Sequence, residues 1–267
     1  MNQDELHAAV CADPDAEPPR IAYADFLAPY RPERSELVRI QLARFAADRA
    51  SDAPRSVHTA RELALVHQHG AEWVRYLRMF LVPDGPLSLG CRFERGFIAH
   101  ARVAIENVMG LGNRLAQYAP IQHLDVTPGE AGGAAARVVG ATILGQLDSI
   151  SLAGLGLTND DARALADCEA LSRARWIDLS NNQLGLDGIE VLARSPVFAN
   201  KIRVLFDGNI SNPVEFAYYD PDGSVADRGA DVDPRNIEDA VGRRVSWLHF
   251  DWGHADRVPD RYYARYA

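Results

Sequence analysis

The residues whose types could do chemistry gather near the C-terminal end, where His249, Asp251, His254 and Asp256 lie within one short stretch. Imidazole nitrogens and carboxylate oxygens together suit zinc, iron or manganese. Neither a helix nor a strand would bring all four side chains to one point, however, and glycine and proline lie beside them. We therefore predict no metal and no cofactor. A metal-dependent or motif-free enzyme that acts through this C-terminal His/Asp cluster stays open as the alternative function.

The other candidate metal-binding and catalytic motifs in the sequence are weaker. His67 and His69 are two positions apart, so they do not share one face of a helix with each other, and His58 precedes both. The segment Asp220–Gly223 resembles a calcium loop, but that loop needs a third acid before its glycine and a glutamate after it. The chain also has no Gly-x-Ser-x-Gly, no phosphate-binding loop and no His-Glu-x-x-His. We predict no catalytic residues.

A repeat between residues 147 and 209 indicates the elements that would position functional side chains. Ile150, Ile177 and Val204 follow one another in steps of 27 residues, and Leu124 precedes the first of them by 26. The pattern Leu-x-x-Leu-x-Leu-x-x-Asn with this period is typical of a leucine-rich repeat. We therefore expect parallel, neighbouring strands near residues 124, 150, 178 and 205.

Each repeat should hold a short strand and a covering helix. Apolar and polar residues alternate within the strands, so one face is buried and the other is open. Thr158 is a good N-cap for the next helix, and Pro196 ends the one after it. Asn182 and Asn209 can satisfy backbone groups in the turn after a strand, whereas Leu155 cannot. The asparagine ladder is therefore incomplete.

The N-terminal part predicts helices first and strands later. Three helices are expected between residues 4 and 47, separated at Asp13–Asp15 and at Pro29–Pro32. A fourth is expected at about 59–70 and a fifth at 106–118, with strands between Phe93 and Val103. A further, alanine-rich helix is expected at about 132–144.

This part of the chain resembles the repeat-companion domain. The likeness lies in Ala12–Asp15, Pro19–Leu27, Glu36–Leu42, Glu72–Trp73 and Phe93–Phe97, which matches the "F-x-RGF" signature. It covers roughly residues 5 to 105. The resemblance implies a bacterial protein in which this domain precedes leucine-rich repeats of the ribonuclease-inhibitor-like type. It implies no activity, because the family has none established.

Two positions depart from the family pattern. Phe26 stands where the family has tryptophan, and the segment Arg31–Glu36 lacks the family's glycine. Tyr23, Asp25 and neighbouring arginines (Arg20 and Arg39) could form a site. We interpret them as structural, because Arg20 and Asp25 lie near helical spacing and can pair, and the Tyr23 hydroxyl needs only one partner.

Composition excludes several classes of function. With 267 residues, 47% of them hydrophobic, the chain can bury a sizeable core. Its net charge of −9 argues against non-specific nucleic-acid binding and against anionic membranes. Three scattered cysteines indicate neither disulfides nor a zinc site. With no signal peptide and no long apolar run, a cytoplasmic protein is expected.

The predicted fold is an α/β leucine-rich-repeat solenoid, short and with a period of about 27 residues. Residues 1–105 form an all-helical N-terminal cap domain, residues 106–210 the solenoid, and residues 211–267 a hairpin with an aromatic C-terminal cap. The hairpin is expected at 215–227. The cap is expected at 245–267, with Trp247, Phe250, Trp252, Tyr262, Tyr263 and Tyr266 covering the exposed end of the repeats.

The predicted function is non-enzymatic: a scaffold that binds a partner protein on the concave face of the repeats. Alternation along the strands places five candidate residues on this face: Asp125, Trp176, Asp178, Arg203 and Asp207. Trp and Arg are frequent anchors of interfaces, and the carboxylates would favour a basic segment of the partner. The alternative is that a short solenoid merely presents soluble residues there.

Overall fold

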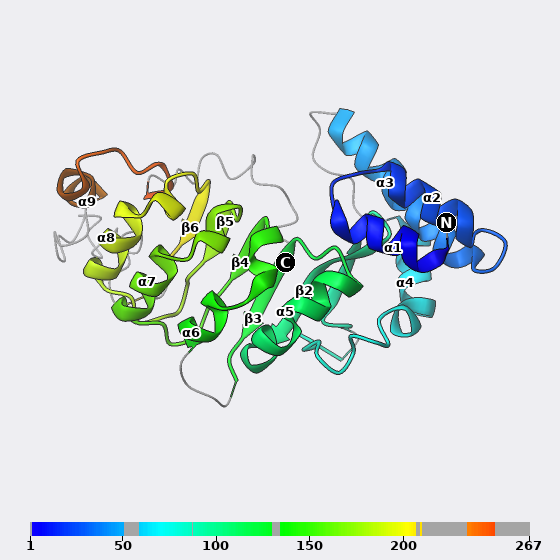
Figure 1. Ribbon diagram of the computed structural model, residues 1–267, viewed down its shortest axis with the longest axis horizontal. Helices are drawn as coiled ribbons and strands as arrows, with labels where there is room; N and C mark the ends of the chain where they lie inside the picture. The colour runs from blue at the N-terminus through cyan, green and yellow to red at the C-terminus, as the bar shows by residue number, and fades with distance from the viewer. Residues whose placement is uncertain are drawn as a thin grey trace, which may run out of the picture. The chain divides into compact units, whose positions relative to one another are not determined.

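In a computed structural model, the structure describes residues 2–50, 59–86, 88–129, 134–206, 209 and 234–248. Over these residues the fold is mixed α/β, and its six-stranded sheet has the order β1-β2-β3-β4-β5-β6 (Figure 1). The chain divides into two compact units. The first comprises the described residues up to Ala101 together with Arg114–Ile121, and the second comprises Arg102–Asn113 and the described residues from Gln122 onward.

The first unit begins with the helices that the sequence predicts. They are α1 (Gln3–Ala12), α2 (Pro18–Leu27), α3 (Pro32–Ala50) and α4 (Ala60–Trp73). Asn2 and Glu5 form a capping box on α1, and the Thr59 hydroxyl caps α4. Proline opens α2 and α3, where its missing N–H would have no helical partner. A core cluster of this unit comprises Leu6, Val10, Tyr23, Ala24, Leu27, Val38 and Phe97.

A hairpin follows, so residues 1–105 are not all-helical as the predicted fold class had them. β1 (Cys91–Glu94) pairs antiparallel with β2 (Phe97–Ala104), close to the strands expected from Phe93 to Val103. Burial alternates along the second half of β2, which is the period of a strand and not of a helix.

The turn of this hairpin depends on its glycine. Arg95 and Gly96 both have positive φ, 50° and 84°, as a two-residue type I′ turn requires. A Cβ on Gly96 would lie 2.7 Å from the Cα of Val38 in α3. Gly96 is therefore needed both for the turn and for its close approach to the helix.

Side chains of α2 and α3 hold this turn from the other side. Gln41 accepts a hydrogen bond from the Gly96 N–H (2.6 Å) and donates to the Phe93 carbonyl (3.1 Å). Buried Arg20 donates to the carbonyls of Arg95 (3.0 Å) and Pro14 (2.7 Å). Arg20 therefore does not pair with Asp25, as the helical spacing suggested, and Asp25 instead forms an ion pair with Arg39.

The second unit contains parallel strands in the predicted register. β3 (His123–Thr127), β4 (Ser149–Ser151), β5 (Trp176–Asp178) and β6 (Arg203–Leu205) are neighbours in this order. Leu124 pairs with Ile150, Ile150 with Ile177, and Ile177 with Val204. These four side chains are at most 5% exposed, so the expectation of parallel strands with this buried face is confirmed.

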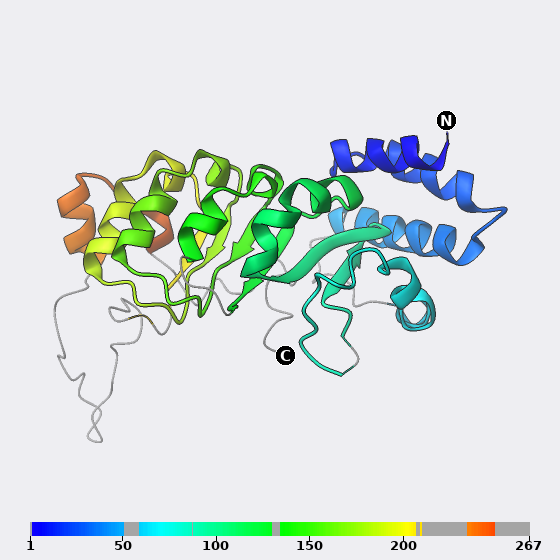
Figure 2. The ribbon, with the colours of Figure 1, turned by 60° about the horizontal axis from the view of Figure 1, so that its bottom comes forward.

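Helical segments alternate with these strands. They are α5 (Ile105–Tyr118), α6 (Ala134–Val139), η1 (Thr142–Gln146), α7 (Asn159–Ala166), η2 (Glu169–Ser172), α8 (Leu186–Arg194) and η3 (Pro196–Phe198). Figure 2 shows α6, α7 and α8 along one side of the strands. Thr158 and Asp161 form the capping box of α7, and Pro196 follows the end of α8, as predicted. The helix expected at 132–144 is instead a short α-helix followed by a 3-10 helix.

The two ladder asparagines satisfy backbone groups as predicted. Asn182 accepts from the Leu157 N–H (3.0 Å) and donates to the carbonyls of Leu152 (2.9 Å) and Leu179 (2.8 Å). Asn209 makes the same set one repeat later, to the Leu184 N–H and to the carbonyls of Leu179 and Phe206.

The described C-terminal segment packs beside the last strand. After α9 (Pro234–Val241), the short helix η5 (Ser246–Leu248) contacts β6. The ring of Trp247 is 5.7 Å from that of Phe206, and its indole N–H donates to the Phe198 carbonyl (3.0 Å). The predicted hairpin at 215–227 and the aromatic residues beyond Trp247 lie outside the described residues. No described helix has the length and apolar character needed to cross a membrane.

Candidate functional site

Two columns of side chains run across the four parallel strands. The pairing puts His123, Ser149, Trp176 and Arg203 in one column and Asp125, Ser151, Asp178 and Leu205 in the other. Neighbouring strands in a sheet lie about 4.8 Å apart, so adjacent members of a column can touch. Of the five predicted binding residues, four thus lie on one face, and Asp207 lies outside the described residues.

Trp176 and Arg203 form the contact at the end of the first column. The guanidinium carbon of Arg203 lies 6.0 Å from the centroid of the Trp176 ring, at cation–π distance. Trp176 is half-buried, whereas Arg203 is only 7% exposed. The prediction of an open Trp176 therefore holds in part, and that of an open Arg203 is wrong, because the arginine packs against its neighbour in the column.

The acidic residues of the second column are not an open strip either. Asp178 is 8% exposed, and its carboxylate accepts hydrogen bonds from the Ser151 hydroxyl (3.2 Å) and the Ser180 N–H (3.0 Å). Since the strands are so short, the carboxylate can reach backbone in the turn that follows. Asp125 retains 22% side-chain exposure and lies 3.9 Å from Arg102. Of the two predicted acidic residues that the structure describes, only Asp125 keeps appreciable exposure.

The described residues contain none of the metal-binding or catalytic sites that were considered from the sequence. His249, Asp251, His254 and Asp256 lie outside them, and so do His58 and Asp220–Gly223. Within the described ranges, no group of three or more His, Cys, Asp or Glu residues could hold a metal ion. Burial raises the pKa of Cys11 to about 11 and that of Cys91 to about 12, so neither thiol is a ready nucleophile at neutral pH.

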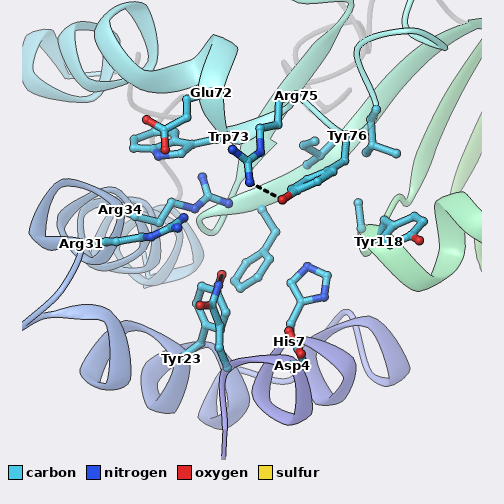
Figure 3. A pocket seen from close by; sticks show the side chains of 15 residues that line it. Asp4, His7, Tyr23, Arg31, Arg34, Glu72, Trp73, Arg75, Tyr76 and Tyr118 are labelled. Atoms are coloured by element: carbon cyan, nitrogen blue, oxygen red, sulfur yellow. Dashed lines mark hydrogen bonds between the residues drawn. The ribbon is translucent and has the colours of Figure 1, made fainter.

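A cavity lies within the first unit, and the sequence did not predict it. The cavity has a volume of about 520 Å³. Arg31, Arg34 and Arg75 line it, and Figure 3 shows Arg31 and Arg34 extending side by side toward the guanidinium end of Arg75. Tyr23 projects into the same space from α2, and Tyr76 from the segment after α4. The lining is therefore cationic and aromatic.

Arg34 is the most enclosed of the three arginines. Its guanidinium carbon lies 4.8 Å from the centroid of the Trp73 ring and 5.0 Å from that of Phe93. Burial lowers the pKa of Arg34 to about 10, against the opposing influence of the Tyr23 hydroxyl. Its Nη1 atom is buried and has no hydrogen-bond partner within the described structure.

His7 adds a titratable group to the cavity wall. Burial lowers its pKa below the usual 6.5, and the charge of Arg34 lowers it further. Asp4 and the backbone at Tyr118 act in the opposite direction. At neutral pH the ring is therefore uncharged, and an anion placed beside it would favour protonation.

The residues that line this cavity come from separate segments, and the sequence alone does not show that these segments meet. Arg31 and Arg34 flank the start of α3, and Arg75 and Tyr76 follow the end of α4. Nothing in their spacing indicates that the two pairs meet, because packing of α4 against α3 brings them together.

Comparisons with known proteins identified no relative. A scan against models of protein families found no match, and neither a search of curated proteins nor one of solved structures returned one.

Proposed function

We propose that the protein is a short leucine-rich-repeat solenoid preceded by a repeat-companion domain. Support comes from the parallel register of the strands and from the backbone bonds of Asn182 and Asn209. The likeness to the companion domain is supported by geometry, since its residues Arg20, Gln41 and Gly96 meet at one hairpin turn. In this proposal Trp247 belongs to a C-terminal cap, because it covers Phe206 beside the last strand.

We further propose that the protein is a non-enzymatic scaffold that binds a partner protein on the polar face of its parallel strands. The observation that carries this proposal is the half-buried Trp176 in a column of otherwise polar side chains, stacked with Arg203. A tryptophan there adds nothing to the buried layer of Ile150, Ile177 and Val204, which points the other way. An aromatic anchor with polar neighbours is the usual centre of an interface.

The negative charge that stays exposed on this face indicates the kind of segment that the partner would present. Asp125 is the member of the acidic column with appreciable exposure, and it favours a basic segment near β3. We place this interaction in the cytoplasm, in line with three cysteines that form no disulfide.

Capture experiments test the binding face directly. The intact protein and Trp176→Ala would be immobilised, and the proteins that each retains from a bacterial lysate would be compared by mass spectrometry. Tyr30→Ala is the matched control, because it removes an aromatic side chain that is 76% exposed in the first unit. We expect Trp176→Ala to weaken the specific interaction by about 2 kcal/mol and the control to leave it unchanged. Equal capture by all three proteins would refute the assignment of the strand face.

The alternative function is an enzyme that uses His249, Asp251, His254 and Asp256. Metal analysis of the purified protein separates the two proposals. A stoichiometric zinc, iron or manganese ion that is lost in His249→Ala would favour the enzyme.

A further inference from the structure

We propose that the cavity of the first unit binds a small phosphate ester, with its phosphate among Arg31, Arg34 and Arg75 and a planar apolar group against the tyrosines. This site is separate from the strand face of the proposed function, and the two can fail independently.

The charge of the cavity carries the first step. Three guanidinium groups point into one space, and the positive charge of Arg31 acts against that of Arg34. Asp4 and Glu72 also line the cavity, but no ion pair joins either of them to these arginines within the described residues. A phosphate bound there would meet positive charge from all three and would relieve the repulsion between Arg31 and Arg34.

The hydrogen bonding of Arg34 carries the second step. Its guanidinium lies beside the rings of Trp73 and Phe93, and its Nη1 is buried without a partner in the described structure. Buried donors are usually satisfied, and because the side chain of Arg34 lines the cavity, an acceptor bound there can satisfy this one. Guanidinium geometry matches phosphate oxygens in paired hydrogen bonds, and the Tyr23 hydroxyl lies in the same wall.

The aromatic residues carry the third step. Tyr76 and Tyr118 line the cavity and are 68% and 54% exposed, respectively. The guanidinium of Arg75 lies 4.4 Å from the Tyr76 ring centroid and is hydrogen-bonded to its hydroxyl, which fixes both groups at the wall. Exposed rings beside an anion site suit a planar ligand group that can stack on them.

The test uses three probes on the full-length protein: phenyl phosphate, inorganic phosphate and phenol. Binding would be measured by calorimetry and by the shift in melting temperature. The variants are Arg34→Gln and Arg75→Gln, and Arg78→Gln is a control that removes one positive charge from the same segment outside the cavity lining.

We expect saturable binding of phenyl phosphate that weakens at least about tenfold, or about 1.4 kcal/mol, in both cavity variants and stays unchanged in the control. Equal affinity for both phosphates would uphold the anion site and overturn the planar group.

Three results would overturn the proposal as a whole: no saturable binding of either phosphate, equal binding in Arg75→Gln and Arg78→Gln, or binding of phenol as tight as that of phenyl phosphate. If Arg34→Gln does not fold, Arg75→Gln decides the matter, since its side chain is exposed and its loss leaves the core intact.

Discussion

Replacing Asn182 with alanine tests whether the buried hydrogen bonds of the asparagine side chain stabilise the parallel strands. The side chain is 5% exposed and bonds to the Leu157 N–H and to the carbonyls of Leu152 and Leu179. Alanine fits the space but offers no hydrogen-bonding group. The perturbation is therefore a loss of polar partners, with little loss of apolar packing.

The magnitude follows from which backbone groups lose their partner. The Leu179 carbonyl keeps the bond from Asn209 (2.8 Å), so it stays satisfied. The Leu157 N–H and the Leu152 carbonyl lose the bonds that Asn182 provides. Each buried group left unsatisfied costs about 1–3 kcal/mol, so Asn182→Ala should lower the free energy of unfolding by roughly 2–6 kcal/mol.

The assay combines urea unfolding with amide hydrogen exchange. Exchange at Leu157 should accelerate more than exchange in the first unit, because the lost bond is local. Gln183→Ala is the control, since it removes a neighbouring amide that is exposed, and it should change stability by less than about 0.5 kcal/mol. A loss below about 1 kcal/mol in Asn182→Ala, with unchanged exchange at Leu157, would refute the ladder as a source of stability.

Three further perturbations test other parts of the structure. Leu179→Ala removes a fully buried side chain between strand and helices and should cost about 2–5 kcal/mol in urea melts, whereas a loss below about 1 kcal/mol would mean that it is not core. Gly96→Ala must accept a positive φ of 84° and a contact with Val38, so we expect a loss of at least about 2 kcal/mol, and an unchanged melting temperature would contradict the turn geometry. The pKa of His7 is lowered in the folded state by burial and by Arg34, so stability should fall as pH drops from 6.5 toward that lower pKa. Melting temperatures across this range should vary less in His7→Gln, and identical profiles would exclude His7 as the cause.

Much of the second unit could be predicted because its information is local and periodic. A strand period fixes which residues are buried, and the 27-residue step fixes which strands pair, so the register from Ile150 to Val204 needed only the sequence. Caps act over a few residues, and Thr158 illustrates this with its partner Asp161 three positions away.

Exposure was harder to predict than register. The alternation correctly placed Asp178 and Arg203 on the same face, but it does not indicate how much of that face its own neighbours cover. Ser151 and Ser180 satisfy the Asp178 carboxylate, and Trp176 covers Arg203, so both depend on tertiary contacts. The cavity of Arg34 and Arg75 has the same origin, because segments as far apart in sequence as α1, α4 and the end of α5 line it.

Arg34 has different hydrogen-bond acceptors from the other enclosed arginines of the first unit. This difference supports the proposal that the cavity binds a ligand. Arg20 is fully buried, yet two backbone carbonyls accept its hydrogen bonds. Arg44 is 17% exposed and pairs with buried Glu62. Arg34 has the rings of Trp73 and Phe93 beside it and a hydrogen bond with the Tyr23 hydroxyl, with neither a carbonyl nor a carboxylate acceptor in the described structure. Backbone carbonyls and a carboxylate accept hydrogen bonds from Arg20 and Arg44, whereas the Nη1 of Arg34 is buried without a partner at the wall of a cavity, where it can donate to an anion from solution.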